Sequence, residues 1–175
     1  MKVLIVLAAL ALAAPAFAGT NPDIRAFYTF DPDYYIHDWE SAPSGSVITG
    51  WLCFDCLGAG GGLTGVSLTL DFLVGGFTAG AADVTVFHPS AQTVIGGPDD
   101  VANGWVIAAP ECVLPGPTGV ICVASVPWYY TGTPGEILIL PNPVDGKAAV
   151  DCNNNIDFFC VLSHGAIGQS VQTPG

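Results

Sequence analysis

Six cysteines are the residues of this 175-residue sequence with the most chemistry to offer. Cys53 and Cys56 have the C-x-x-C spacing of zinc sites and redox pairs, and with Cys112 and Cys122 they would supply four thiolates to a zinc ion. A redox pair of the thioredoxin type opens a helix in an α/β unit, whereas a glycine-rich run, residues 57–62, follows Cys56. The sequence therefore favours structural disulfides over metal or redox chemistry.

The cysteines are even in number, and in an oxidising compartment this predicts three disulfides. Their connectivity can be inferred only from separation along the chain. Short separations favour three local pairs, Cys112 with Cys122, Cys152 with Cys160, and by elimination Cys53 with Cys56. A bridge from Cys53 or Cys56 to a distant strand is the alternative.

Three histidines, His37, His88 and His164, are the candidate bases for a hydrolase that uses a Ser, Thr or Cys nucleophile. None of them lies in a nucleophile motif, and the sequence has no G-x-S-x-G elbow. Ser163 and His164 would point to opposite faces if they continue a strand. A small secreted hydrolase is therefore the second and weaker alternative function.

Residues 31–40 gather carboxylates among aromatic side chains, a composition that suggests paired acid and base work on a glycoside. The titratable members of the segment are Asp31, Asp33, His37, Asp38 and Glu40. Two carboxylates in one short segment rarely face each other across a substrate, as that chemistry requires. A solvated acidic connection is favoured, and no catalytic residue is assigned.

Aromatic residues offer stacking surfaces for a sugar on a sheet face. The set most expected to be exposed is Trp128, Tyr129 and Tyr130, which directly follows Pro127. Core packing explains most of the tryptophans equally well. These three side chains make a carbohydrate-binding module the first alternative function.

Oxygen-bearing side chains recur at alternate positions late in the chain, at Asp151, Asn153, Asn155 and Asp157. This D-x-N-x-N-x-D spacing begins calcium loops, and Asp145 would add a further ligand. Ile156 stands where an EF-hand needs glycine and Leu162 where it needs glutamate, so an EF-hand is excluded. The favoured alternative is an asparagine turn, since asparagine tolerates left-handed backbone, with Cys152 and Cys160 bridged across it.

The composition indicates an exported, acidic chain. Hydrophobic residues make up 51% of the sequence and charged residues 10%, against about 25% charged in ordinary globular proteins. A basic start, an apolar run and an A-x-A site predict a signal peptide, residues 1–18. Its cleavage removes one of the 3 basic residues, so 2 remain against 15 acidic ones and the net charge changes from −12 to −13. Nucleic acid is excluded as a partner, and no membrane insertion is expected after cleavage.

Alternation of apolar and polar residues predicts the strands that must position these groups. It is strictest over Val66–Phe72 and recurs over Ile24–Phe30, Val47–Cys53 and Val84–Val86. Three later segments are apolar on both faces and are expected to be central strands covered on both sides: Trp105–Ala109, Val120–Val126 and Ile137–Leu140. One or two helical turns are expected within Asp31–Ser41, where Pro32 follows an aspartate cap.

Turn signals rich in glycine and proline separate these segments. Residues 19–175 are therefore expected to form one all-β domain, a two-layer antiparallel β-sandwich with Ig-like or jelly-roll connections and disulfide staples.

Much of the chain after Leu63 resembles uncharacterised secreted proteins from uncultured bacterial lineages, a family with no assigned activity. The stretches that carry the resemblance are Gly65–Phe72, Gly104–Ala108, Thr131–Gly146 and Asp151–Gly168. The resemblance implies a secreted, cysteine-containing sandwich and brings no catalytic residues. The pattern Leu68-Thr69-Leu70-Asp71 is also similar to the L-T-[LY]-D pattern of cohesin-type sandwiches.

Together these features predict a non-enzymatic structural or interaction module, secreted or held at the cell surface. Its partner would be a protein or a glycan. No cofactor is expected apart from calcium at the D-x-N-x-N-x-D loop.

Overall fold

The computed structural model describes residues 20–33, 37–56, 62–80, 93–100 and 102–169. Within these residues the regular structure is entirely β, and no helix that could cross a membrane is found there. The strands are β1 (Thr20–Thr29), β2 (Trp39–Ala42), β3 (Val47–Asp55), β4 (Leu63–Leu73), β5 (Gly76–Thr78), β6 (Thr93–Gly96), β7 (Trp105–Val113), β8 (Val120–Tyr130), β9 (Gly135–Leu140), β10 (Ala148–Asp151), β11 (Ile156–Ser163) and β12 (Gly165–Gln169).

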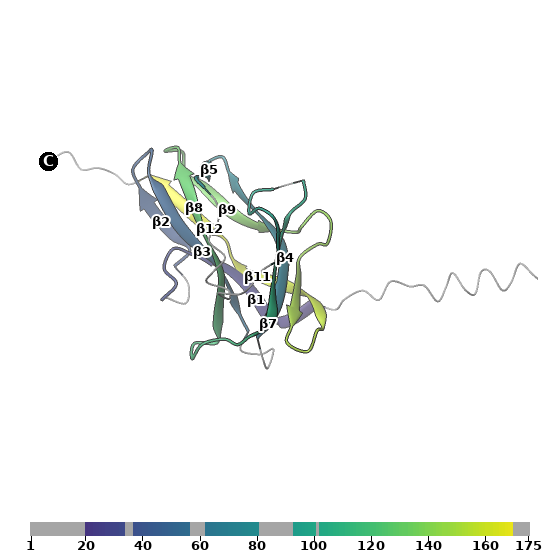
Figure 1. The fold of residues 1–175 in the computed structure, drawn as a ribbon. Helices are drawn as coiled ribbons and strands as arrows, with labels where there is room; N and C mark the ends of the chain where they lie inside the picture. Colours follow the sequence, from purple (N-terminus) through teal and green to yellow (C-terminus); the bar gives the residue numbers. More distant parts are fainter. Residues whose placement is uncertain (1–19, 34–36, 57–61, 81–92, 101, 170–175) are drawn as a thin grey trace, which may run out of the picture.

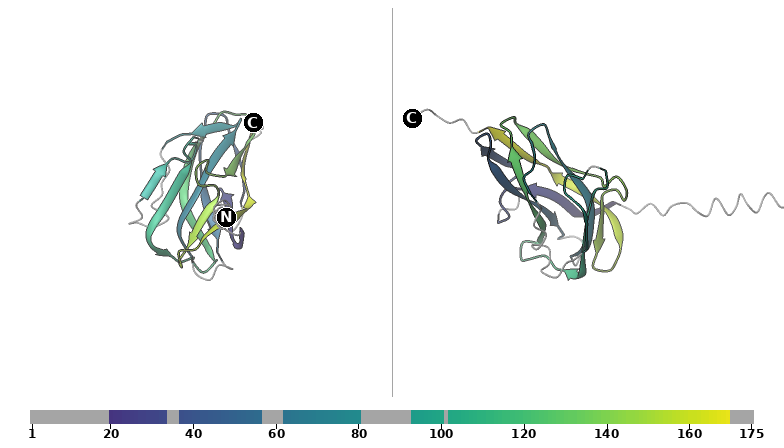
Figure 2. Two further views of the ribbon diagram at one scale, coloured as in Figure 1. Left: turned by 90° about the vertical axis from the view of Figure 1, so that its right-hand side faces the viewer. Right: turned by 45° about the horizontal axis from the view of Figure 1, so that its top comes forward.

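The strands pack as a two-layer β-sandwich (Figure 1). One layer has the order β11-β1-β3-β8-β5, and the other has the order β2-β12-β9-β4-β7-β6. The first half of β4 pairs with β7 and β10, and its second half pairs with β9. Because β10 also pairs with β11, it joins the two layers along one side, as the turned views show (Figure 2). The pairs β1–β11 and β2–β12 are parallel, and the other pairs are antiparallel.

The alternating segments form strands as predicted. β3 and β4 contain two of the segments, β1 contains Ile24–Phe30 except for its last residue, and the fourth segment, Val84–Val86, lies outside the described residues. The helical expectation is wrong over Trp39–Ser41, which belongs to β2. This segment pairs in parallel with residues 166–169 of β12, a long-range partner that the local helix signal does not reveal.

The segments that are apolar on both faces are strands, but they are not covered on both sides. On β7, Trp105 and Ile107 are buried, whereas Val106 and Ala108 between them are half-exposed. The same alternation runs along β8. These strands therefore give the sandwich an apolar outer surface as well as an apolar core.

A hydrogen-bonded aromatic pair lies at the centre of the core. The indole Nε1–H of Trp128 donates to the hydroxyl of Tyr28 at 2.6 Å, and both side chains are fully buried. The Trp128 ring also meets the edge of Phe72 from the other layer, with centroids 5.5 Å apart. Glycines make room for Tyr28, since a Cβ at Gly50 or Gly165 would lie 2.3 or 2.5 Å from its ring. Burial raises the pKa of Tyr28 far above its usual value, so the hydroxyl stays protonated.

Replacing Tyr28 by phenylalanine should destabilise the fold. The Tyr28→Phe variant leaves the buried Trp128 N–H without an acceptor, and we expect the free energy of unfolding to fall by about 1–3 kcal/mol. Urea unfolding followed by tryptophan fluorescence measures the change. Tyr129→Phe, which removes a hydroxyl from a half-buried ring on the outer face, is the control and should be nearly neutral. Equal losses in the two variants would contradict the assignment.

The tip of the β4–β5 turn is strained. Val74 has a φ of 68°, and the N–H of Gly75 donates to the carbonyl of Leu73 at 2.8 Å, which is the hydrogen bond of a γ-turn. A β-branched residue with positive φ costs on the order of 1–3 kcal/mol. The Val74 side chain is 80% exposed, so burial offsets little of this cost.

Replacing Val74 by asparagine should relieve that strain. Asparagine adopts positive φ more readily than valine, so Val74→Asn should raise the stability by about 1 kcal/mol. Differential scanning calorimetry at neutral pH measures the shift. Val144→Asn is the matched control, because Val144 is 73% exposed and its φ is not positive. A gain shared by both variants would point to lower surface hydrophobicity instead of strain.

Candidate interaction face

The aromatic set expected to stack on a sugar is mostly buried. Trp128 and Tyr130 have no exposed surface, so the prediction that they form an exposed platform is wrong. The alternation of β8 turns only Tyr129 outward, where it stacks on Phe77 with ring centroids 5.1 Å apart. The carbohydrate-binding alternative thereby loses two of the three side chains on which it rested.

The histidines do not form a nucleophile–base arrangement among the described residues. The Nδ1 atom of His164 accepts the backbone N–H of Ile139 at 2.9 Å, and burial lowers the pKa of this imidazole. The backbone N–H of His37 donates a hydrogen bond to the Thr29 hydroxyl at 3.2 Å. His88 lies outside the described residues. Within those residues, no three His, Cys, Asp or Glu side chains come together as a metal would require.

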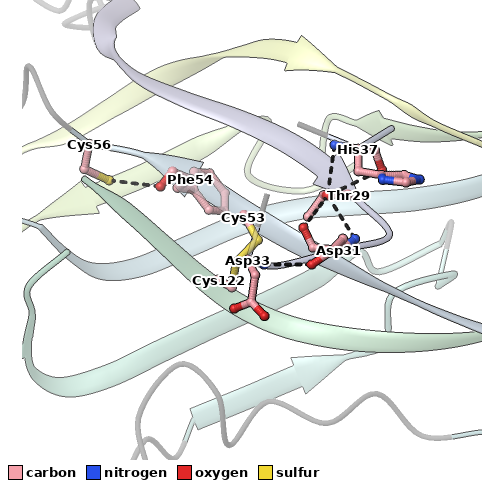
Figure 3. Close-up of a disulfide and its surroundings, with 8 residues drawn as sticks. All are labelled: Thr29, Asp31, Asp33, His37, Cys53, Phe54, Cys56 and Cys122. Atoms are coloured by element: carbon pink, nitrogen blue, oxygen red, sulfur yellow. Dashed lines mark hydrogen bonds between the residues drawn. A yellow bond between two sulfur atoms is a disulfide. The ribbon is translucent and has the colours of Figure 1, made fainter. Parts of the chain in front are cut away.

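The acidic segment acts as a connection between strands. A carboxylate oxygen of Asp31 accepts the backbone N–H of Asp33 at 3.0 Å, and the Thr29 hydroxyl donates to the Asp31 carbonyl at 2.9 Å. This turn lies beside the disulfide between Cys53 and Cys122 (Figure 3). The carboxylate of Asp31 therefore stabilises a turn.

The disulfide pairing differs from the predicted one. Cys53 bonds to Cys122 and Cys112 bonds to Cys152, whereas Cys56 and Cys160 are free thiols. All three local pairs are therefore wrong, and the alternative of a bridge from Cys53 to a distant strand is confirmed. The reason is topological, because Cys53 on β3 lies directly opposite Cys122 on β8 although 69 positions separate them. Burial raises the pKa of the Cys56 thiol to about 12, so this group is not a reactive thiolate.

The D-x-N-x-N-x-D segment forms the turn of the β10–β11 hairpin. One carboxylate oxygen of Asp151 accepts the backbone N–H groups of Asn153 and Asn155 at 2.8 Å each, and the other accepts the Asn155 side-chain amide at 2.8 Å. Asn154 has a φ of 64°, as the turn alternative predicted, although Cys152 and Cys160 are not bridged. The Asp157 side chain lies outside the description. Calcium binding stays a prediction.

Asp151→Ala should loosen this hairpin. Burial disfavours the charged form, but the hydrogen bonds from Asn155 and Asn153 outweigh it and hold the pKa of Asp151 below its usual value. The stabilisation is therefore present above the unfolded pKa of about 3.9 and is lost as the pH falls through the lower folded value. Urea unfolding at pH 7 should show a loss of about 1–3 kcal/mol that shrinks in acid.

Asp145→Ala, which removes an exposed carboxylate from the preceding loop, is the control and should change little. A loss for Asp151→Ala that is independent of pH would contradict the role of the charged carboxylate. The turn alternative also predicts equal melting temperatures in calcium and in chelator.

A groove of about 350 Å³ runs along the outer face of β4 between β7 and β10. Thr64, Gly65 and Ser67 of β4 belong to its floor. Its walls come from β7 and from the β10–β11 hairpin: Val106, Ala108, Pro110, Ala148, Val150 and Asn154. None of the described residues that line the groove is charged, although the chain carries a net charge of −12. The groove is thus an uncharged, largely apolar surface.

One buried polar atom without a partner belongs to the lining of this groove. Ser67 is 7% exposed, and its hydroxyl oxygen makes no hydrogen bond within the described structure. Other buried atoms of this kind, such as the Thr69 hydroxyl and the Asn142 Nδ2 atom, belong to residues outside the lining. Such an atom costs about 1–3 kcal/mol when nothing satisfies it. The unsatisfied Ser67 hydroxyl makes the groove a candidate for a site that a bound group completes.

Two sets of contacts involve the strands that flank the groove. Asn142, which follows β9, packs on Gly104, which precedes β7, and a Cβ at Gly104 would lie 2.2 Å from Asn142 Nδ2. Leu63, the first residue of β4, pairs with Val113 of β7 and with Asp151 of β10. The Cys112–Cys152 disulfide joins these two flanking strands beside that position.

Comparison with solved structures identifies the fold. The third ScaB cohesin of R. flavefaciens, solved in complex with a group 1 dockerin, is similar with a TM-score of 0.57 and 9% identity over 88% of this chain and 98% of the cohesin. A chain of a cohesin–dockerin complex from Clostridium thermocellum that contains the OlpC cohesin is similar with a TM-score of 0.57 and 8% identity. The match covers 86% of this chain and 97% of that chain. The sixth cohesin of scaffoldin B from Acetivibrio cellulolyticus, solved with a Cel5 dockerin mutant, is similar with a TM-score of 0.56 and 12% identity. The match covers 84% of this chain and 99% of that chain.

The chain therefore has a cohesin-like β-sandwich fold. The cohesin similarity predicted from the L-T-L-D pattern is confirmed at this level, and the pattern lies in β4, the strand beneath the groove. No protein-family model matches the sequence, and no curated protein matches it.

The groove itself was missed by the sequence reasoning. A usable signal was present, because β7 is apolar at both its inward and its outward positions. An apolar residue that faces outward needs a cover, and the second layer of a sandwich covers one face only.

Proposed function

We propose that this chain is an exported, non-enzymatic protein–protein interaction module that docks a partner protein in the groove on β4. The cohesin-like fold supports the proposal, since the similar structures named above were solved as complexes of cohesins with dockerins. The two disulfides and this fold indicate an extracellular or cell-surface setting. Cleavage of the signal peptide, residues 1–18, is part of the proposal.

The observation that carries the proposal is the unsatisfied Ser67 hydroxyl at the floor of an uncharged groove. A purely structural face would place an apolar residue here, because burying an unpaired hydroxyl lowers stability. A partner that covers the apolar walls and offers one polar group at the floor would bury the walls, and it would satisfy the hydroxyl once the Ser67 side chain rotates toward the groove. Docking of a partner thereby explains both the apolar walls of the groove and the unpaired hydroxyl of Ser67.

The charge of the chain favours some partners over others. With a formal charge of −12, or −13 after cleavage, the chain repels acidic proteins at long range and attracts basic ones. The groove is uncharged, so the contact itself would be apolar with hydrogen bonds at its centre. Dockerin modules with a neutral or basic binding surface are the first partners to test.

Site-specific photocrosslinking tests the proposal. Benzoylphenylalanine is placed at Ala108 in the groove or at Thr49, an exposed position on the outer face of β3, and the mature chain is mixed with dockerin modules and with the exported proteins of its source. We expect a saturable crosslink to one protein from position 108 and none from position 49. The captured protein is then purified and titrated by calorimetry.

Val106→Asp should weaken binding of that purified partner by at least about 30-fold, which corresponds to a central contact worth about 2 kcal/mol. Thr49→Asp adds the same charge outside the groove and should leave the affinity unchanged. Circular dichroism checks that both variants are folded. Unchanged binding by a folded Val106→Asp variant, or equal crosslinking from both positions, would reject the groove as the docking site.

A further inference from the structure

The Cys112–Cys152 disulfide connects the two walls of the groove. Pro110 lies on the β7 wall two residues before Cys112, and Val150 lies on the β10 wall two residues before Cys152. β7 and β10 are not neighbours in the sheet, because β4 lies between them. The disulfide therefore adds a covalent link where no strand pairing joins the walls.

The C-terminal end of strand β7 departs from regular antiparallel pairing with β4 close to this disulfide. Leu63 of β4 pairs with Val113, but Gly65, two residues on, pairs with Ala108, so residues 109–112 oppose Thr64 alone. On the other side the β10 register also shifts between Val150 and Asp151. At this end the disulfide is a direct covalent link between the walls, whereas strand pairing connects them only through Leu63 of β4.

The hairpin that forms one wall is held to β4 by strand pairing over residues 148–151 and by the Thr64 hydroxyl, which donates to the carbonyls of Val150 and Asp151, but it makes few core contacts. β10 contributes only Ala149 to the hydrophobic core, and its register with β11 covers residues 148–150. The turn residues Asn153 and Asn155 are exposed. Segments with few buried apolar contacts open at low free energy, so the disulfide is expected to govern the opening of this hairpin.

The two disulfides differ in access. Cys112 is exposed and Cys152 is half-exposed, whereas in the other disulfide Cys53 is fully buried and Cys122 is half-exposed. The turn that contains Asp31 and Asp33 lies beside the Cys53–Cys122 bond (Figure 3). Thiol–disulfide exchange requires access of the attacking thiolate to sulfur, so a dithiol in solution would reach Cys112–Cys152 first.

We propose that the Cys112–Cys152 disulfide is a redox latch on the groove, closed when the chain is competent to dock and opened by an exported dithiol reductant. One thiolate of the dithiol attacks a sulfur of the disulfide and forms a mixed disulfide, and its second thiol then displaces the chain. The dithiol becomes a disulfide, and Cys112 and Cys152 become thiols. The docking half of this proposal rests on the proposed function, whereas the movement of the hairpin does not.

The test begins with the mature chain alone, treated with dithiothreitol under native conditions. Alkylation and peptide mass spectrometry should find Cys112 and Cys152 reduced while Cys53 and Cys122 stay bonded. Hydrogen exchange should then lose at least about tenfold protection at the amides of Asn153 and Asn155, which donate to Asp151, with no change in β3 and β8. Reduction of Cys53–Cys122 first, or unchanged hairpin exchange, would overturn the latch.

Docking is measured next, against the partner captured through position 108. A Cys112→Ser/Cys152→Ser double variant should bind about tenfold more weakly than the oxidised chain, because the groove is no longer preorganised. Cys160→Ser, which removes a half-exposed thiol outside the groove, is the matched control and should bind normally. If the double variant fails to fold, the selectively reduced wild-type chain replaces it.

The outcomes separate the two proposals. Loss of hairpin protection with unchanged affinity would overturn the latch and leave the docking groove intact. Unchanged binding by Val106→Asp would reject the docking groove, and with it the control of docking, while hydrogen exchange would still report whether the disulfide holds the hairpin.

Discussion

The hydrogen bond between Trp128 and Tyr28 is the constraint on which the arrangement of the two layers depends. Two large aromatic side chains from β8 and β1 meet in the core, where the Tyr28 hydroxyl accepts the buried Trp128 N–H. Their size sets the space between the layers at this point, and only glycine fits beside Tyr28 at positions 50 and 165. Trp128 in turn packs on Phe72, which is how the aromatic pair positions β4.

Strand β4 connects the core to the candidate site, because its residues contribute to both. Its inward side chains lie in the core, and its outward side chains include Ser67 at the floor of the groove. The strand is also shared, since different halves pair with β10 and with β9. The backbone in the middle of such a strand has little freedom to move. The backbone position of Ser67 is therefore preorganised, which reduces the ordering that a partner must impose on docking.

The sequence predicted the fold better than it predicted the site. Alternation around Leu68 and Leu70 revealed β4, because half-burial leaves a period of two in the sequence itself. The disulfides could not be paired in the same way, since residues as far apart as Cys53 and Cys122 meet only after the sheet has formed. The aromatic residue Trp128 was predicted on the wrong side for a related reason. Its immediate neighbours, Pro127 and Tyr129, are not clearly polar, so the local pattern does not show which face is inside.

The outward apolar residues of β7 link the sequence, the fold and the proposed docking. A chain with only 3 basic and 15 acidic residues relies on its net negative charge for solubility. Apolar residues that face outward, such as Val106 and Ala108, are therefore costly unless something covers them for part of the protein's life. They lie beside a buried hydroxyl that lacks a partner, and the two walls of that groove are tied by a disulfide. The groove lining combines apolar walls with the polar side chains of Thr64, Ser67 and Asn154. A lining of this kind suits recognition, in which shape and a few hydrogen bonds select the partner.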